Sequence, residues 1–423
     1  MQAFEKENKI TYCTRCLYPS NHPLHLAFNA KGVCTGCLVH DEKDNYDWHY
    51  GLAQLKEITS SYQKENDYDC IIPVSGGRDA YFIVHFVKYV LGLKPLLVSY
   101  NRHYNTGLGV RNLECLRTRL GCDIVMSTIS PSKLKCITQN TLKLLGSIHW
   151  AYLAGSTVFP VQTAVKRKIP LIIWGAHQGI DQVGMFFHKD QVEMTRRYRR
   201  EHDLMGFEAE DLVNKTPDLT EESLSSFFYP ADTDLMRVGV RGIYLNNFIY
   251  WDTKKQHEAM IKMYGYKAHT LNRTFDSYND IDCQYYTDVH DYIKYLKFGF
   301  SKVTDHACRE IRLGRLTRDE ALKLEGYFQN KPVQHLKKLT DWLEISTQEF
   351  DKYIQAFVAK KGVDKVTCLA KLNIAPQGEI NYILDKLNFL SNENPEIHRL
   401  SQSEQLLLRG WASQADSVEP HHG

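Results

Sequence analysis

A pair of glycines between two apolar segments is the strongest candidate for chemistry in this sequence. Residues 70–74 are mostly apolar, Ser75 to Asp79 read Ser-Gly-Gly-Arg-Asp, and residues 80–91 are mostly apolar. This order predicts a strand, a tight turn and a helix. Adjacent glycines let backbone amides approach an anion, and a helix N-terminus adds unpaired N–H groups and a positive dipole end. The stretch is therefore predicted to cradle phosphate, with a ligand-free turn as the alternative.

Four cysteines near the N-terminus have the spacing of a metal site. Two C-x-x-C pairs, separated by seventeen residues, comprise Cys13, Cys16, Cys34 and Cys37. Two such pairs supply four thiolates for a tetrahedral Zn²⁺ ion. Because cysteine would occupy all four coordination positions, none is left for a substrate. The pairs therefore predict a structural zinc ribbon, and a metal-free redox pair is the alternative.

The elements that must position the glycine turn alternate along the chain. Strands are expected at 70–74, 96–100, 123–126 and 170–174, and helices at 108–120, 131–145 and 154–168. Strands that alternate with helices indicate the α/β class with a doubly wound parallel sheet, in which ligands bind beyond the carboxyl ends of the strands. The glycine turn follows the first of these ends.

The glycine turn lacks the G-x-x-x-x-G-K-[ST] pattern of a Walker A loop. It resembles instead the S-G-G-x-D-[S] signature of the PP-loop ATP pyrophosphatases, which cleave ATP between the α and β phosphates and adenylylate a substrate oxygen. The resemblance implies that ATP and Mg²⁺ are bound by Ser75, Gly76, Gly77, Arg78 and Asp79. Ala80 stands where the signature has its last serine, and the missing hydroxyl is expected to weaken phosphate binding by about 1–3 kcal/mol.

Polar residues follow two of the expected strands. Ser99 and Tyr100 end the second strand and are candidates to contact the adenosine of ATP. Gly175 and Asp181 belong to a segment that resembles the glycine-to-aspartate segment placed opposite the turn in other PP-loop enzymes. The resemblance implies that Asp181 shares Mg²⁺ with the aspartate of the glycine turn and that His177 orients the substrate. A loop histidine without a catalytic role is the alternative.

Basic residues concentrate between residues 294 and 318, although the 423-residue chain has a formal net charge of only +2. Here Lys297 begins the run K-F-G-F-x-x-x-T-D-H-A, and residues 310–321 read E-I-R-x-G-R-x-T-R-x-E-A. Together with the cysteine pairs and the glycine turn, this run resembles the N-acetyl sugar amidotransferase family of surface polysaccharide biosynthesis. The resemblance covers roughly residues 10–325.

This resemblance implies that ATP activates an acetamido oxygen of a nucleotide-linked sugar and that ammonia then replaces it, leaving an acetamidino group. Lys297, Arg312 and Arg315 are expected to bind substrate anions, and Asp305 or His306 to orient or deprotonate ammonia. A structural aspartate–histidine pair is the alternative for the last two. The chain has no glutaminase nucleophile motif, so ammonia is expected from separate glutaminase and cyclase-like subunits.

Composition sets the class of protein and its organisation. The chain contains 43% hydrophobic residues and no apolar run that would span a membrane, so we expect a cytoplasmic protein with a large core. Its near-neutral charge gives no global attraction to nucleic acid, so no nucleic-acid partner is expected. The expected divisions are a zinc ribbon, a PP-loop domain, a substrate-binding region with an insertion, a helical C-terminal region and a disordered tail, at 1–45, 46–190, 191–330, 331–411 and 412–423.

Two other functions are compatible with the glycine turn. A PP-loop tRNA sulfur transferase would also combine a zinc ribbon with adenylylation, but it needs a sulfur-carrying cysteine, and the cysteines after the glycine turn are scattered. A non-catalytic nucleotide-binding scaffold is the other alternative, and the alanine at the last position of the signature favours it. Binding of tRNA in a salt-titrated assay would support the first.

Overall fold

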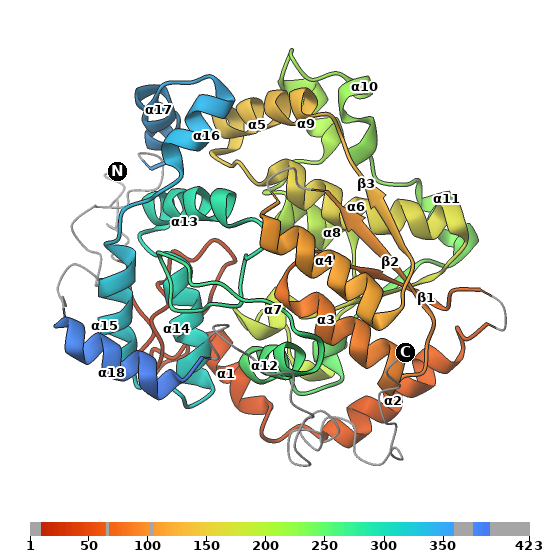
Figure 1. Cartoon of the computed structure of the whole chain (residues 1–423), viewed down its shortest axis with the longest axis horizontal. Helices are drawn as coiled ribbons and strands as arrows, with labels where there is room; N and C mark the ends of the chain where they lie inside the picture. Colours follow the sequence, from red (N-terminus) through yellow and green to blue (C-terminus); the bar gives the residue numbers. More distant parts are fainter. Residues whose placement is uncertain (1–9, 65–66, 102–104, 359–374, 390–423) are drawn as a thin grey trace, which may run out of the picture.

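A five-stranded parallel sheet organises the computed structural model, which describes residues 10–64, 67–101, 105–358 and 375–389. The strands are β1 (Cys70–Pro73), β2 (Pro95–Tyr100), β3 (Ile124–Ser127), β4 (Leu171–Trp174) and β5 (Arg241–Tyr244). Their order is β3-β2-β1-β4-β5, and every neighbouring pair is parallel (Figure 1). The chain therefore changes direction across the sheet between β1 and β4, which is where ligands bind in such sheets.

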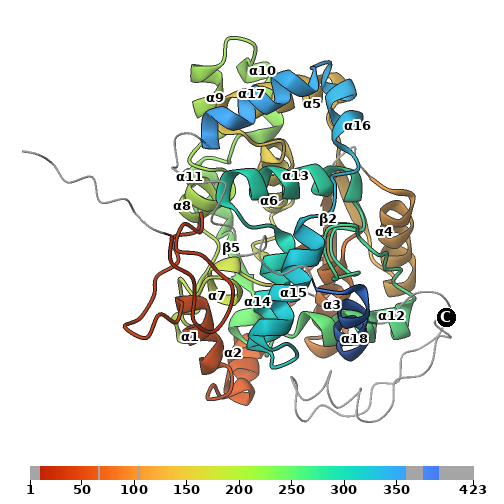
Figure 2. The ribbon, with the colours of Figure 1, turned by 90° about the vertical axis from the view of Figure 1, so that its left-hand side faces the viewer.

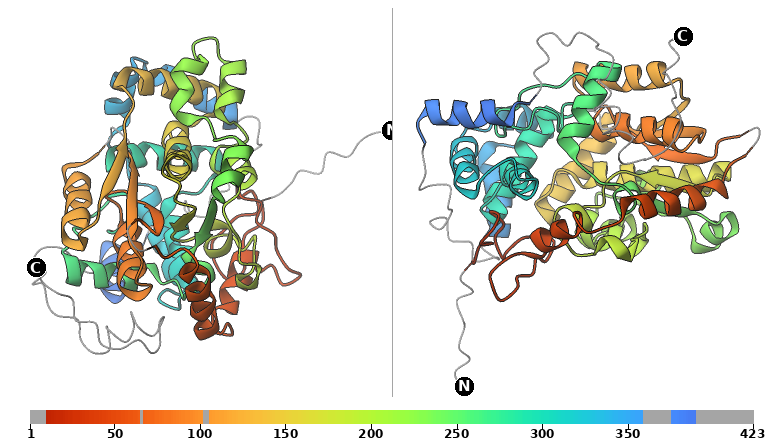
Figure 3. Two further views of the ribbon diagram at one scale, coloured as in Figure 1. Left: turned by 90° about the vertical axis from the view of Figure 1, so that its right-hand side faces the viewer. Right: turned by 90° about the horizontal axis from the view of Figure 1, so that it is seen from below.

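Helices cover both faces of this sheet, as the sequence predicts. One face carries α3 (Arg78–His85), α4 (Gly107–Leu120) and α12 (Thr253–Tyr264), and the other carries α6 (Trp150–Arg167). Side chains alternate along β1, so Ile72 packs toward the first group and its neighbour Ile71 toward α6. Figure 3 shows α4 (orange) and α6 (yellow) on opposite sides of the strands. The doubly wound arrangement is therefore confirmed.

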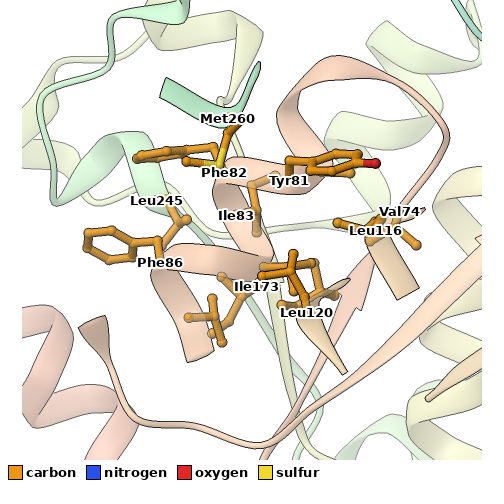
Figure 4. Close-up of a cluster of buried hydrophobic side chains, with 14 of the residues drawn as sticks. Val74, Tyr81, Phe82, Ile83, Phe86, Leu116, Leu120, Ile173, Leu245 and Met260 are labelled. Atoms are coloured by element: carbon orange, nitrogen blue, oxygen red, sulfur yellow. The ribbon is translucent and has the colours of Figure 1, made fainter. Parts of the chain in front are cut away.

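The core beneath the glycine turn is built from elements far apart in sequence. Figure 4 shows Phe82 and Ile83 of α3 beside Ile173 of β4 and Met260 of α12. These side chains are at most 5% exposed. This packing fixes α3 against the sheet and so fixes the position of the turn that precedes it.

The remaining helices of the first half follow the expected pattern closely. The predicted helix 131–145 is α5 (Pro131–Leu145), which begins after the N-cap Ser130 and ends at Gly146, where φ is +57°. Proline at the first helical position and glycine after the last are the usual start and stop signals. Short helices occupy the next region: α7 (Gln178–Asp181), α8 (Arg196–Tyr198), α9 (Ala209–Lys215), α10 (Glu221–Leu224) and α11 (Asp232–Val238).

β5 was not predicted as a strand. It pairs with β4 from Leu171↔Arg241 to Trp174↔Tyr244. The sheet therefore extends past residue 190, into the range 191–330 that is expected to bind substrate. Its local pattern is weak, because only two of its four residues, Ile243 and Tyr244, are hydrophobic. The backbone hydrogen bonds to β4 define it as a strand.

The N-terminal segment forms a small unit with isolated antiparallel bridges, Tyr12↔Pro19 and Phe28↔Cys34. Two helices follow it, α1 (Thr35–Glu42) and α2 (Trp48–Ser60). Figure 2 shows this red segment beside α7 and α14, and its cysteines share a buried cluster with residues of α14 and α15. It is therefore packed onto the C-terminal helices.

The C-terminal region is helical, as predicted. The helices described in the expected range 331–411 are α16 (Leu336–Leu343), α17 (Thr347–Val358) and α18 (Gln377–Leu387). Before them, within the range expected to bind substrate, come α13 (Gln284–Phe298), α14 (Lys302–Arg312) and α15 (Arg318–Gln329). α16 and α17 pack on α5 and α13, whereas α18 packs on α15. The expected tail at 412–423 lies outside the described residues. Across the described ranges, no helix is long and apolar enough to cross a bilayer.

Candidate active site at the strand ends

The glycine turn between β1 and α3 has the geometry of an anion cradle. Gly77 is the N-cap residue of α3, and no side chain caps that helix. Its amide donates to Ser75 Oγ at 3.1 Å. A side chain at Gly76 would overlap the backbone of Gly109, so only glycine fits. The turn therefore brings backbone donors together at the positive end of a helix, as the phosphate prediction requires.

Ala80, which replaces the last serine of the signature, is the third residue of α3 and is 5% exposed. Its methyl group belongs to the core cluster of the glycine turn's face of the sheet. The alanine therefore packs against apolar neighbours.

Two side chains hold the carboxylate of Asp79: the imidazole of His257 and the guanidinium of Arg78. Its Oδ1 lies 3.1 Å from His257 Nε2 and 3.3 Å from Arg78 Nε. Burial raises the pKa of Asp79, but the Arg78 charge and the His257 hydrogen bond outweigh it, so the pKa is lowered. His257 comes from α12 and is completely buried. The carboxylate is therefore ionised at neutral pH.

Arg78 also faces a second buried carboxylate. Its Nη1 is 3.9 Å from Asp276 Oδ2 and makes no hydrogen bond within the described part of the chain. Asp276 itself is paired with Arg309 at 2.8 Å and accepts hydrogen bonds from Asn279. Burial opposes ionisation of Asp276, but the Arg309 charge lowers its pKa well below the usual value. The Arg78 guanidinium therefore has an Nη1 donor at the turn that no described residue accepts from.

Asp181 acts on Asp79 through its negative charge, which opposes the lowering of the Asp79 pKa, and a Mg²⁺ ion shared by the two stays a prediction. Its own partner is Lys43, whose Nζ donates to Asp181 Oδ1 at 2.9 Å and to the Trp251 carbonyl at 3.2 Å. Burial raises the pKa of Asp181, yet the Lys43 charge and hydrogen bond lower it to about 2. Two ionised carboxylates therefore stand at neighbouring strand ends.

The four cysteines form the compact cluster that the spacing predicts. All four sulfurs lie within 4.8 Å of one another and all four residues are buried. The backbone amides of Arg15, Cys16 and Cys34 donate to the Cys13 sulfur at 3.3–3.4 Å. Amide donors and four convergent sulfurs suit thiolates around a tetrahedral ion, so this donor set fits a structural Zn²⁺. Among the described residues it is the one His, Cys, Asp and Glu group with metal-ligand proximity.

Arg312 joins this cluster to the candidate active site. Its Nη2 lies 3.7 Å from Cys34 Sγ and 3.9 Å from Cys16 Sγ, while its Nη1 donates to the carbonyls of Gln182 at 2.6 Å and Asp181 at 3.3 Å. The guanidinium therefore connects the thiolates to the loop that carries Asp181. Its predicted substrate contact stays a prediction.

The other two basic residues expected to bind substrate have protein partners of their own. Lys297 donates to the carbonyls of Leu145 and Gly146, at 3.1 and 3.4 Å, and so caps the C-terminus of α5. Arg315 donates to Asp252 at 2.9 and 3.1 Å and also pairs with Glu310. Each cation thus has protein partners, and its substrate role remains a prediction.

Asp305 and His306 are neighbours in α14 but have different partners. Asp305 accepts from the Tyr18 hydroxyl at 3.1 Å and pairs with Lys294. His306 lies 2.6 Å from Thr274 Oγ1 and 2.7 Å from Asn279 Nδ2. Burial lowers the pKa of His306 to about 4, so its ring is neutral at pH 7. The structure does not bring the two together as an acid–base pair, and their roles in ammonia chemistry remain predictions.

The residues expected near the adenosine and substrate occupy several surroundings. Ser99 is buried, and the Tyr100 ring lies against α6, where a side chain at Gly155 would overlap it. Gly175 follows β4 and is closely covered, because an added Cβ would lie 2.8 Å from Ile83 Cδ1. His177 lines a cavity at the ends of β4 and β5. The contacts of these residues with ligands remain predictions.

Sequence reasoning missed four residues of this site. Lys43 ends the cysteine-rich segment, His257 lies in an ordinary amphipathic helix, and Asp276 and Asp282 belong to an acidic loop. An added Cβ on Gly77 would lie 3.5 Å from both carboxylate oxygens of Asp282, which places that carboxylate at the turn. The acidic loop was the one available signal, since Lys43 and His257 have no distinctive local pattern.

Comparison with known proteins finds a likeness in the C-terminal half of the chain. Residues 272–366 match the family model described as the C-terminal domain of WbpG-like LPS biosynthesis proteins. A search of curated proteins found no match. The matched range includes the basic run of α13 to α15 and excludes the glycine turn and the cysteines. It supports the expected relation to a family of LPS and surface polysaccharide biosynthesis.

Proposed function

We propose that this protein is an ATP-dependent amidotransferase of LPS or surface polysaccharide biosynthesis. It adenylylates the acetamido oxygen of a nucleotide-linked sugar and substitutes ammonia to form an acetamidino group. The observation that carries the proposal is the uncapped glycine turn of α3 at the direction change of the sheet, with Asp79 in the first turn of that helix and Asp181 acting on it electrostatically. The match to WbpG-like LPS biosynthesis proteins supports the sugar substrate.

The glycine turn is proposed to bind the phosphates of ATP. The backbone of Gly76 and Gly77 and the hydroxyl of Ser75 form the cradle, and Arg78 adds a cation with a donor to spare. Preorganised donors of this kind stabilise charge that develops on a departing phosphate. We therefore assign pyrophosphate departure to this end of α3.

Asp79 and Asp181 are proposed to hold Mg²⁺ together with the phosphates. Both carboxylates are ionised at neutral pH, and both have lowered pKa values despite burial. Mg²⁺ in phosphoryl-transfer sites is bound by one or two carboxylates with substrate phosphates and water, so a pair of aspartates is a sufficient donor set. When bound, the ion would neutralise charge on the phosphates.

The proposed reaction has two steps, adenylylation of the acetamido oxygen and its replacement by ammonia. The acetamido oxygen attacks the α phosphorus of ATP, and the bond to the β phosphate breaks to release pyrophosphate. Ammonia then adds to the activated carbon, which loses AMP together with the original amide oxygen and releases one proton. Activation is needed because an amide oxygen is a poor leaving group. Separate glutaminase and cyclase-like subunits are proposed to supply the ammonia.

Product analysis tests this proposal. The full chain is incubated with ATP, Mg²⁺, ammonium and a panel of nucleotide-linked acetamido sugars, and AMP, pyrophosphate and sugar products are separated. We expect AMP and pyrophosphate only with a substrate sugar, with a loss of at least about 100-fold in Asp79→Asn. Asp341→Asn, at an exposed pair with Lys337, is the matched control and should retain activity. ADP formation, or AMP formation independent of any sugar, would contradict the proposal.

A further inference from the structure

The cavity lined by His177 lies at the same edge of the sheet as the glycine turn. It has a volume of about 140 Å³ and opens beside Trp174 and Tyr244, the last residues of β4 and β5. Its wall also contains His177, Tyr198 and Asp203. Because β4 is the direct neighbour of β1, and adjacent strands lie about 4.8 Å apart, one extended ligand can reach both places.

His177 presents an unused donor at this cavity. The residue is 2% exposed, and its Nδ1 accepts a hydrogen bond from the Gly179 amide at 3.0 Å. Burial lowers the pKa of His177 to about 4, so the ring is neutral at pH 7. A neutral ring that accepts at Nδ1 carries its proton at Nε2. This Nε2 is buried and has no hydrogen-bond partner within the described residues.

Two further polar groups line the same wall. Trp174 Nε1 is a buried N–H donor that likewise has no partner in the described chain. Asp203 contributes a carboxyl group whose pKa burial raises to about 7, against the lowering effect of Arg199. The cavity thus combines two unpaired N–H donors with a carboxyl group that accepts a hydrogen bond when ionised. A ring with two carbonyl oxygens and an N–H between them complements this set.

The size and the walls of the cavity favour a single planar ring. The rings of Tyr198 and Tyr244 lie 4.3 and 4.6 Å from the His177 ring, between their centroids. Aromatic side chains stack on flat heterocycles of any kind, because each such ring has a π-face. An internal cavity of about 150 Å³ accommodates benzene, so a volume of this order suits one six-membered ring better than a fused purine.

We propose that this cavity binds a uracil-type pyrimidine base, with the unpaired N–H groups of His177 and Trp174 donating to its carbonyl oxygens. The inference rests on the proposed function, because it makes the base part of the nucleotide-linked sugar. The base at β4 and β5 then directs the diphosphate and sugar toward the glycine turn. It also leaves the turn itself for ATP.

Calorimetric titration of the full chain with UMP, CMP and AMP tests the inference without requiring chemistry. We expect UMP to bind at least about tenfold more tightly than CMP or AMP, a difference that one good hydrogen bond accounts for. Trp174→Phe and His177→Asn should each weaken UMP binding by about tenfold, while ATP binding and the unfolding temperature stay near those of the wild type. Asparagine retains an acceptor for the Gly179 amide. His49→Asn, at an exposed histidine, is the matched control.

Two results would overturn the inference. If neither variant changes UMP binding, the base binds elsewhere. If AMP binds more tightly than UMP and the variants weaken AMP binding, the cavity binds adenine. If His177→Asn fails to fold, Trp174→Phe alone decides the question. UMP binding without sugar-dependent AMP formation would retain the cavity assignment and reject the amidotransferase. Sugar-dependent AMP formation without UMP binding would support the amidotransferase and reject the cavity assignment.

Discussion

At the scale of single residues, the candidate active site consists of carboxylates held ionised by partners from distant segments. Asp79 is paired with His257 of α12, and Asp181 with Lys43 at the end of the cysteine-rich segment. Removing a carboxylate from water raises its pKa, so each needs a cation or donor to stay charged. These partners keep two carboxylates charged, as the proposed binding of Mg²⁺ and phosphate requires.

Lys43→Met tests the most buried of these pairs. Lys43 holds the pKa of Asp181 at about 2, below its ordinary 3.8, so the pair stabilises the fold above about pH 4 and this contribution is lost as pH falls toward 2. Leaving this partly buried carboxylate unpaired should lower the free energy of unfolding at pH 7 by about 2–3 kcal/mol. Denaturant titration measures the change. Lys337→Met, at an exposed pair with Asp341, should change it by less than about 1 kcal/mol, and equal effects of the two variants would refute the assignment.

At the scale of elements, the glycine turn depends on close contact between α3 and α4. Glycines at the turn were predictable because they lie between an apolar strand and an apolar helix. The partner helix was also predictable, but the contact between Gly76 and Gly109 was not, because it depends on how two separate elements pack. β5 illustrates the same limit, since its pairing with β4 defines it more than its own residues do.

Gly76→Ala tests whether the turn must approach α4 so closely. The new methyl group would overlap the Gly109 backbone and displace the turn. We expect pyrophosphate release to fall by at least about 100-fold, because a small misplacement of binding groups is costly, and stability to fall by about 1–3 kcal/mol. Gly107→Ala, where the added methyl meets open space at the start of α4, should behave like the wild type. Normal activity of Gly76→Ala would exclude the turn as the phosphate site.

Metal removal tests the link between the cysteine cluster and the active-site loop. Elemental analysis should find one zinc per chain in the wild type and in Cys136→Ser, which lies outside the cluster, but not in Cys34→Ser. Without the metal, Arg312 loses the thiolates that hold its Nη2. We therefore expect faster amide hydrogen exchange at residues 181–184 in the Cys34→Ser protein. Unchanged exchange there would show that the loop is held independently of the cluster.

At the scale of the whole molecule, one doubly wound sheet carries the candidate active site while the N- and C-terminal segments pack together beside it. The sequence was sufficient to predict four of the five strands, the cysteine cluster and the glycine turn, because each depends on short-range spacing. It was not sufficient to predict Lys43 or His257, whose neighbours in the chain resemble those of any surface or helix residue, and it marked Asp276 only as part of an acidic loop. Their roles arise only when α12 and the loop before α13 fold over the turn.

The stability of the folded chain should fall as pH rises toward 8 because of Glu325 in α15. Burial raises its pKa from 4.5 to about 7, although the Thr304 hydroxyl donates to it and opposes the shift. A raised folded-state pKa gives stability that is present below about pH 4.5 and lost as pH rises through about 7. Glu325→Gln should therefore be more stable than the wild type at pH 8, by about 1–3 kcal/mol, and differ less at pH 5.

Unfolding measured at both pH values checks this expectation. Glu222→Gln, at an exposed glutamate, is the control and should show no pH-dependent gain. A Glu325→Gln protein that is equally destabilised at pH 5 and pH 8 would mean that the carboxyl group does not titrate on folding as proposed.

Isotope transfer tests the central claim most directly. A nucleotide-linked sugar labelled with heavy oxygen in its acetamido carbonyl is converted with ATP, Mg²⁺ and ammonium, and the AMP is analysed by mass spectrometry. Adenylylation of the acetamido oxygen predicts that the label leaves the sugar and appears in the phosphate of AMP, with the sugar product carrying nitrogen in its place. Unlabelled AMP together with a sugar that retains its label would contradict the account.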